Sequence, residues 1–192
     1  MARPRSITDE RLLAAAETVI GRCGPGFTLA QVAAEAGAAV GTVAQRFGSK
    51  AGLLQALSRR ATVLAVSQMQ ARAEAADDPV AGLSSAAVSV YAVLGDPEEA
   101  ANHLGQLGVD IGDPELRALL GEHYTAVETE LRRLMLAAAP ALPHAPSVPR
   151  AARALLAVLN GVALDWSIRP HGRLADRLTE DVDAVLAAWE AR

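Results

Sequence analysis

Few side chains in this sequence have the types and spacing that catalysis or metal binding needs. Cys23 is the single cysteine, which excludes an internal disulfide and makes a thiolate metal cluster implausible. The histidines lie in separate segments, without metal-ligand spacing, at His103, His123, His144 and His171. The chain also lacks the G-x-S-x-G, G-x-x-x-x-G-K and dinucleotide-binding motifs. We therefore expect neither an enzyme nor a protein that holds a metal or a cofactor.

One short stretch instead carries polar groups that are suited to double-stranded DNA. Arg46 has the donors to contact guanine, and Gln45 has the paired donor and acceptor to contact adenine. Thr42 can contact a phosphate or a thymine methyl group. Lys50 can contact a backbone phosphate from the start of the following helix. This spacing predicts a surface that reads a DNA groove.

The distribution of charge is uneven along the chain. Residues 1–60 contain eight basic and four acidic side chains, whereas the remaining residues contain ten basic and 18 acidic ones. A basic first segment on an acidic chain favours a polyanion as the partner of that segment alone. Because the excess is only four charges, a chance distribution remains the alternative.

The composition predicts an all-α fold of about nine helices. Hydrophobic residues make up 51% of the chain and aromatic residues only 3%, and alanine and leucine are strong helix formers. No charge-free apolar run is long enough to span a membrane, and charged residues near the amino terminus do not fit a signal peptide, so we expect a soluble cytoplasmic protein. Between glycine and proline breaks, the expected helices span residues 7–21, 29–36, 40–46, 50–75, 80–94, 97–106, 114–138, 149–168 and 174–190.

The second and third of these helices are short and are separated only by Gly37-Ala38-Ala39. Thr28 and Gln31 have the spacing of a capping box, which begins a helix at residue 29. Val32 and Val43 can seal the contact between the two helices. This arrangement is typical of a helix-turn-helix, in which the second helix enters a major groove.

Residues 11–54 resemble the DNA-binding domain of the TetR family of transcriptional regulators. The resemblance rests on Arg11–Ala16, on Gly26–Leu29 and on the stretch QVAAEAGAAVGTVAQRFGSKAGLL at Gln31–Leu54. The matching positions are Thr28, Val32, Ala33, Ala36, Gly37, Gly41, Thr42, Val43, Phe47, Lys50, Leu53 and Leu54. The residues that we expect to contact DNA are Arg3, Arg5, Thr28, Val40, Thr42, Gln45, Arg46 and Lys50. Thr28 is expected to act first as a helix cap, and the arginine pair is expected to reach the minor groove.

The chain departs from the family pattern at three positions of the recognition helix. The family usually has a serine or threonine at Ala39, a tyrosine at Ala44, and a histidine or aromatic residue at Arg46. Loss of the cap oxygen costs about 1 kcal/mol of helix stability. We therefore expect DNA binding that is weaker, or depends more on charge, than is usual in the family.

The resemblance implies a DNA-binding domain at residues 1–55 and a helical regulatory domain at residues 56–192. It further implies a homodimeric repressor that a small hydrophobic ligand releases from double-stranded operator DNA, with no membrane partner. The glycine-rich residues 97–113 could link the ligand cavity to the DNA-binding domain. The alternative is a helical ligand-binding or protein-interaction module with weak or non-specific DNA binding, which Ala39, Val40 and Ala44 motivate.

The resemblance also suggests where the ligand and a second subunit would bind. The candidate ligand-binding residues are Met69, Tyr91, Leu94, Asn102, His103, Leu107, Tyr124, Met135 and Trp166, with the histidine as polar anchor. The candidate dimer-interface residues are Leu155, Leu159, Val162, Trp166, Leu178, Val182, Val185 and Trp189. For both sets, the alternative is an ordinary core within one chain.

Overall fold

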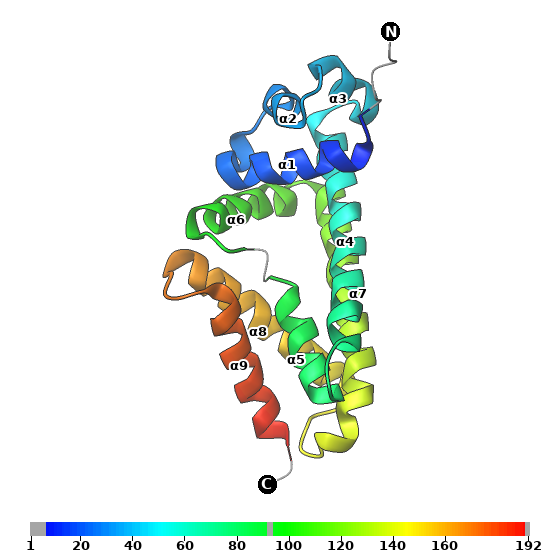
Figure 1. Ribbon diagram of the computed structural model, residues 1–192, viewed down its shortest axis with the longest axis vertical. Helices are drawn as coiled ribbons and strands as arrows, with labels where there is room; N and C mark the ends of the chain where they lie inside the picture. The colour runs from blue at the N-terminus through cyan, green and yellow to red at the C-terminus, as the bar shows by residue number, and fades with distance from the viewer. Residues whose placement is uncertain (1–6, 92–93, 191–192) are drawn as a thin grey trace. The chain divides into compact units, whose positions relative to one another are not determined.

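A computed structural model describes residues 7–91 and 94–190 of the 192-residue chain, and this part is all-α, as the composition predicts (Figure 1). Its helices are α1 (Asp9–Cys23), α2 (Leu29–Ala36), α3 (Val40–Phe47), α4 (Lys50–Glu74), α5 (Pro79–Ser89), α6 (Pro97–Gly112), α7 (Pro114–Ala138), α8 (Val148–Ile168) and α9 (Leu174–Trp189). Two 3₁₀ turns, η1 (Gly24–Gly26) and η2 (Ala139–Ala141), follow α1 and α7.

Two helices differ in length from the sequence-based prediction by more than one residue. α5 ends at Ser89 instead of residue 94, and α6 continues to Gly112 instead of ending at residue 106. Gly105 lies inside α6, where a Cβ atom would come within 3.3 Å of the Pro25 ring. The glycine therefore permits a close approach in mid-helix, and it does not mark the end of the helix.

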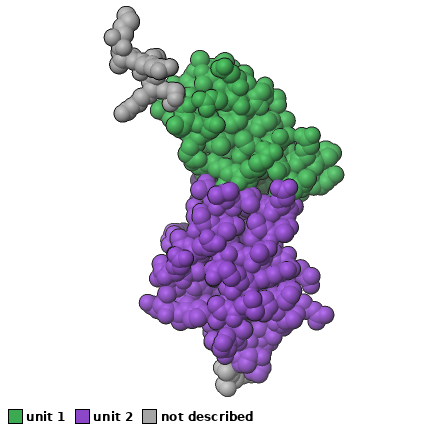
Figure 2. Space-filling model, turned by 90° about the vertical axis from the view of Figure 1, so that its right-hand side faces the viewer, with its two compact units in different colours: residues 1–60, 98–120 green, residues 61–97, 121–192 purple. Residues whose placement is uncertain are grey.

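The chain divides into two compact units (Figure 2). Unit 1 consists of residues 1–60 and 98–120, and unit 2 consists of residues 61–97 and 121–192. The sequence predicts a regulatory domain that begins at residue 56. The structure instead groups most of α6 and the first turns of α7 with the helix-turn-helix.

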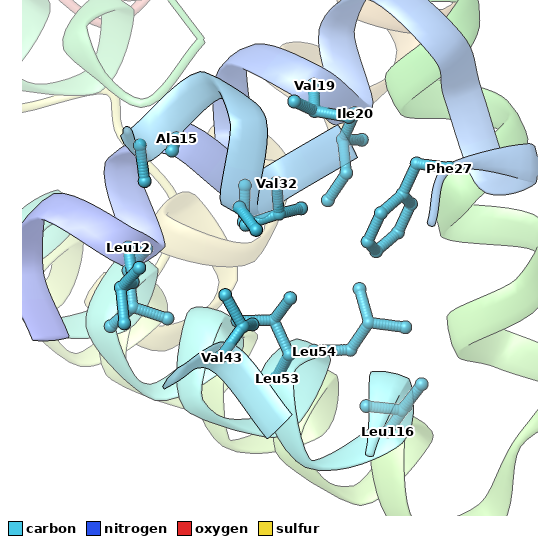
Figure 3. Close-up of a cluster of buried hydrophobic side chains, with 14 residues drawn as sticks. Leu12, Ala15, Val19, Ile20, Phe27, Val32, Val43, Leu53, Leu54 and Leu116 are labelled. Carbon is cyan, nitrogen blue, oxygen red and sulfur yellow. The ribbon is translucent and has the colours of Figure 1, made fainter. Parts of the chain in front are cut away.

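Unit 1 is built around a single apolar core to which α1, α2, α3, α4 and α7 contribute (Figure 3). Leu12, Val32, Val43 and Leu53 are all fully buried in it. The Leu116 side chain of α7 completes the same cluster. α2 and α3 have only eight residues each and are too short to be stable alone, so burial in the shared core keeps them helical.

The start of α2 is fixed by the predicted capping box. The Gln31 amide donates to Thr28 Oγ1 at 3.2 Å, and the Thr28 amide donates to Gln31 Oε1 at 2.7 Å. Gly37 ends the helix with φ at 68°, in the left-handed region where glycine is favoured. Both ends of α2 therefore follow from residues at or next to them.

Asp113 caps α7 in a similar way. Its Oδ1 atom accepts from the amides of Glu115 and Leu116 at 2.9 and 3.0 Å. Asp78 does the same for α5 through Val80 and Ala81. These contacts satisfy amides that no intrahelical partner reaches.

Unit 2 is organised around α8, which packs against α5 and α9. α8 has the length and apolar composition of a membrane-spanning helix. Its Leu155, Leu159 and Trp166 side chains are buried in the unit, as in the core helix of a folded domain. α8 therefore has an explanation that requires no membrane.

Replacing Thr28 with alanine should lower the free energy of unfolding by about 1 kcal/mol, because the capping box loses its hydroxyl acceptor. Chemical denaturation followed by circular dichroism measures this change. Thr129→Ala is the matched control, since its exposed hydroxyl bonds only to the Thr125 carbonyl within α7. Equal losses in the two variants would contradict the role of the cap.

Candidate nucleic-acid interface

The recognition helix α3 has one buried side and one solvent-facing side. Val43 is fully buried against the core, whereas Val40 is 47% exposed. Gln45 and Arg46 are also exposed, and Thr42 is half-buried. The structure thus brings together four of the predicted DNA-contacting residues on one short helix.

The amino-terminal end of α3 lacks the usual side-chain cap of the family. Ala39 has the extended backbone of an N-cap residue, and its carbonyl accepts from the Thr42 amide at 2.9 Å. Alanine carries no side-chain oxygen, so it cannot accept a bond from a first-turn amide. This departure, noted from the sequence, therefore leaves the first turn without the stabilisation that Thr28 gives α2.

Arg46 is held by an acidic residue that the sequence analysis did not single out. Its Nη1 atom forms an ion pair with Asp9 Oδ1, in the first turn of α1. Both side chains are exposed, at 42% for the arginine and 57% for the aspartate. Because 37 residues separate the partners, no local sequence pattern could reveal the pair.

Lys50 has partners other than the predicted phosphate. Its Nζ atom donates to the carbonyl oxygens of Pro25 and Phe27 at 2.6 and 2.7 Å, and it lies 4.1 Å from the centre of the Phe27 ring. Partial burial lowers the pKa of this amine. Two of its three N–H donors therefore hold the start of α4 against the segment between α1 and α2, leaving one donor for a phosphate.

The other acidic residues of the first 60 pair with arginines that lie outside α3. Arg60 binds both Glu10 and Glu17, with 2.7 Å between Nη1 and Glu17 Oε1, and Arg22 binds Glu35. The arginine beside Glu10 lowers the pKa of that carboxyl group. Within α3 itself, Arg46 is the one charged residue, so it supplies the positive charge of this helix.

Thr28 is occupied as the cap of α2, as expected, although its side chain remains exposed. Arg3 and Arg5, which were expected to reach the minor groove, lie outside the described residues.

The nine candidate ligand-binding residues fall into different units. Asn102, His103 and Leu107 belong to unit 1. The Asn102 side chain donates to the Gly21 carbonyl at 2.7 Å. Burial lowers the pKa of His103, whereas nearby Glu99 and Glu17 oppose this shift. The hydrogen bond from Asn102 to α1 accounts for the position of this side chain without a ligand.

The other six candidates lie in unit 2. Tyr91 donates to Asn160 Oδ1 of α8 at 2.5 Å, and burial with the nearby Tyr124 raises the pKa of its hydroxyl. Asn160 was missed in the sequence analysis because an amide in an apolar helix carries no distinctive spacing. The remaining members, three of them almost fully buried, are Met69, Leu94, Met135 and Trp166.

Six of the eight candidate interface residues are buried within one chain. The Leu155, Leu159, Val162 and Trp166 side chains of α8 are at most 9% exposed, and Leu178 and Val182 of α9 are fully buried. They therefore form the intramolecular core, which is the alternative that their pattern left open, and cannot present a surface to a second chain. Val185 and Trp189 are half-buried.

Among the described residues, an open pocket of about 490 Å³ lies beside Cys23 in unit 1, and another of about 570 Å³ lies beside Arg72 and Arg173 in unit 2. Neither is lined by any of the nine candidate ligand residues. Within the described part of the chain, no group of three His, Cys, Asp or Glu side chains could hold a metal ion.

Residues 12–57 match the family model described as "Bacterial regulatory proteins, tetR family". No curated protein matches the chain in sequence.

Solved structures of regulators match over nearly the full length. One is FadR from Bacillus subtilis in complex with stearoyl-CoA, with a TM-score of 0.76, 17% identity, and coverage of 94% of this chain and 98% of that one. Another is SmeT, repressor of the Stenotrophomonas maltophilia efflux pump SmeDEF, with a TM-score of 0.71, 22% identity, and coverage of 97% and 92%. A TetR regulator from Haloarcula marismortui has a TM-score of 0.79 at 13% identity, with coverage of 95% and 98%.

The family match covers α3, which contains the buried Val43 and the exposed Arg46, and the fold match covers 94% of the chain. The helix-turn-helix therefore belongs to the TetR family of bacterial transcriptional regulators, and the whole chain has the fold of that family.

Proposed function

We propose that this protein is a homodimeric cytoplasmic repressor that binds operator DNA through α3 and is released by a small hydrophobic ligand. The observation that carries the proposal is the orientation of α3. Its Val43 side chain anchors the helix in the core, while Gln45 and Arg46 remain exposed to contact base edges.

The dimer surface that we propose lies on the side of α8 opposite its buried stripe. Ala157, Gly161, Leu164 and Ile168 are all exposed and recur every three or four residues. The two larger residues are 46% and 66% exposed. Small residues beside exposed apolar ones suit close packing of this face against the same face of a second copy.

The ligand site that we propose uses the polar group formed by Tyr91, Tyr124 and Asn160 in unit 2. The nearby apolar candidates of unit 2 favour a hydrophobic ligand, which these groups would orient by hydrogen bonds. The likeness to FadR bound to stearoyl-CoA and to the SmeT repressor supports a regulator of this kind. Release requires that the ligand bind more tightly to the conformation that does not fit the operator.

A second candidate function follows from the departures in α3. Ala39 gives the helix no side-chain cap, and Lys50 already donates two hydrogen bonds to backbone carbonyl oxygens. Both features reduce what α3 and its neighbour can offer a duplex. They favour a helical ligand-binding or protein-interaction module that binds DNA without sequence preference.

Binding to DNA that flanks the protein's own gene separates these functions. Gln45→Ala should weaken binding to this duplex by about 1–3 kcal/mol, because a base-edge contact is lost, and should leave binding to unrelated duplex almost unchanged. Fluorescence anisotropy over a range of salt concentrations measures both affinities.

Gln68→Ala is the matched control, because Gln68 is an exposed glutamine on the part of α4 that belongs to unit 2. It should leave both affinities unchanged. Equal affinity of the wild-type protein for the two duplexes would support the second candidate function instead.

Gly161→Arg should convert the dimer to a monomer. A Cβ atom at Gly161 would meet nothing within 4 Å in its own chain, so the substitution should leave the fold of the chain intact. In the proposed dimer, the same side chain would place bulk and charge between two apposed faces. Sedimentation velocity measures the change in mass.

Leu136→Arg serves as the control for this experiment, because Leu136 is a 64% exposed apolar residue on α7 in the same unit. It should remain dimeric. A dimer that survives Gly161→Arg, or a wild-type chain that is monomeric, would contradict the proposed surface.

Asn160→Leu should weaken the binding of a hydrophobic ligand about fivefold or more, because one hydrogen-bond partner of the Tyr91 hydroxyl is lost. Stearoyl-CoA and an uncharged aromatic drug are the probes, and a thermal shift with duplex-release titration is the measurement. Ser67→Ala, at an exposed hydroxyl on α4, should not affect binding. Release of duplex by neither probe would leave this ligand assignment unsupported.

A further inference from the structure

We infer that Asp9 is a positioning residue, which holds the Arg46 guanidinium in place to contact a guanine base. This inference rests on the proposed function, because it assumes that α3 enters a major groove. It adds a residue of α1, outside the helix-turn-helix itself, to those that determine which sequence is bound.

The geometry of the ion pair leaves the arginine able to read a base. Asp9 Oδ1 accepts from Nη1 of Arg46. The Nε and Nη2 atoms have no partner among residues 7–91 and 94–190, so they can donate together to O6 and N7 of a guanine. The side chain is 42% exposed, so a base edge can reach it while the aspartate stays bound.

Asp9 is itself well fixed. It is the first residue of α1, whose start is capped by Thr8 through a 3.3 Å bond from the Arg11 amide. The next turn is anchored by Leu12, which is fully buried in the core of unit 1. The carboxylate therefore extends from a rigid element and not from a loop.

A restrained arginine should favour sequence recognition in two ways. An unrestrained guanidinium would lose considerable side-chain entropy on binding a base, and a fixed one has already lost part of it. In addition, the charge of Asp9 offsets that of Arg46, which is the basic residue of α3. This reduces the attraction to phosphates that is common to all sequences.

The other acidic residues of the described first segment do not take this role. Glu10 and Glu17 bind Arg60 of α4, and Glu35 binds Arg22 near the end of α1. Among the acidic residues of the segment 7–60, Asp9 is thus the one that pairs with α3.

The test begins with selection of binding sites from a random duplex library by the full-length wild-type protein. Arg46→Ala identifies the guanine that this residue contacts, because the selected motif should lose its preference there. Substituting that guanine by adenine should weaken wild-type binding about tenfold or more. In the Asp9→Asn variant, the same base change should weaken binding only about threefold, because the arginine is no longer held in position.

Glu35→Gln is the matched control, since it removes one negative charge and breaks an ion pair about 20 Å away along α1. In this control, replacing the guanine with adenine should still weaken binding about tenfold or more, even if affinity for all duplexes rises. We call this ratio of affinities the base penalty. The penalty is a ratio measured within each variant, so a partly unfolded fraction does not alter it. Thermal unfolding confirms that each variant is folded.

The possible failures are distinguishable. If Asp9→Asn keeps the full penalty, the inference is wrong while the proposed function stands. If Arg46→Ala instead weakens all duplexes alike and lowers the salt slope by about 0.9, the arginine contacts a phosphate and the inference is again wrong. If the wild-type protein selects no motif, the proposed function itself fails.

Discussion

The burial of Val43 is the interaction on which the rest of the DNA-binding surface depends. α3 has only eight residues, and an isolated helix of that length is not stable in water. The buried valine side chain contributes about 1.5–3 kcal/mol, and it fixes which side of α3 faces solvent. Since Ala39 supplies no side-chain cap, α3 depends more on this packing for its stability than a capped recognition helix does.

The elements that the sequence predicted correctly are those set by local residues. Thr28 and Gln31 are three positions apart, so their capping box could be read directly, as could the cap at Asp113. The length of α6 could not be predicted from the local sequence. Gly105 lies inside the helix at a point that passes close to Pro25, which is 80 positions earlier in the chain, and no local pattern reveals such a contact.

The candidate site shows the same division. The exposed face of α3 followed from helical spacing and from the match around Gly37 and Val43. The partners of Arg46 and Lys50 did not, because Asp9 and Pro25 lie 37 and 25 residues away. Spacing also could not show which apolar face of α8 is internal, since both faces recur with the helical period. Only the packing of α5 and α9 decides that Leu159 is buried and Ile168 is exposed.

The small number of base-reading groups on α3 bears on the dimer that we propose through the exposed face of α8. Each base pair that is read correctly contributes about 1–3 kcal/mol, whereas specific DNA binding requires about 4–10 kcal/mol over non-specific binding. The base contacts of Gln45 and Arg46 in a single chain would contribute less free energy than the middle of that range. Two copies joined through α8 would double the number of base contacts, with half-sites about one helical turn apart. In the proposed dimer, the apolar residues around Gly161 would therefore serve specificity together with the polar residues of α3, because they would bring a second recognition helix to the same operator.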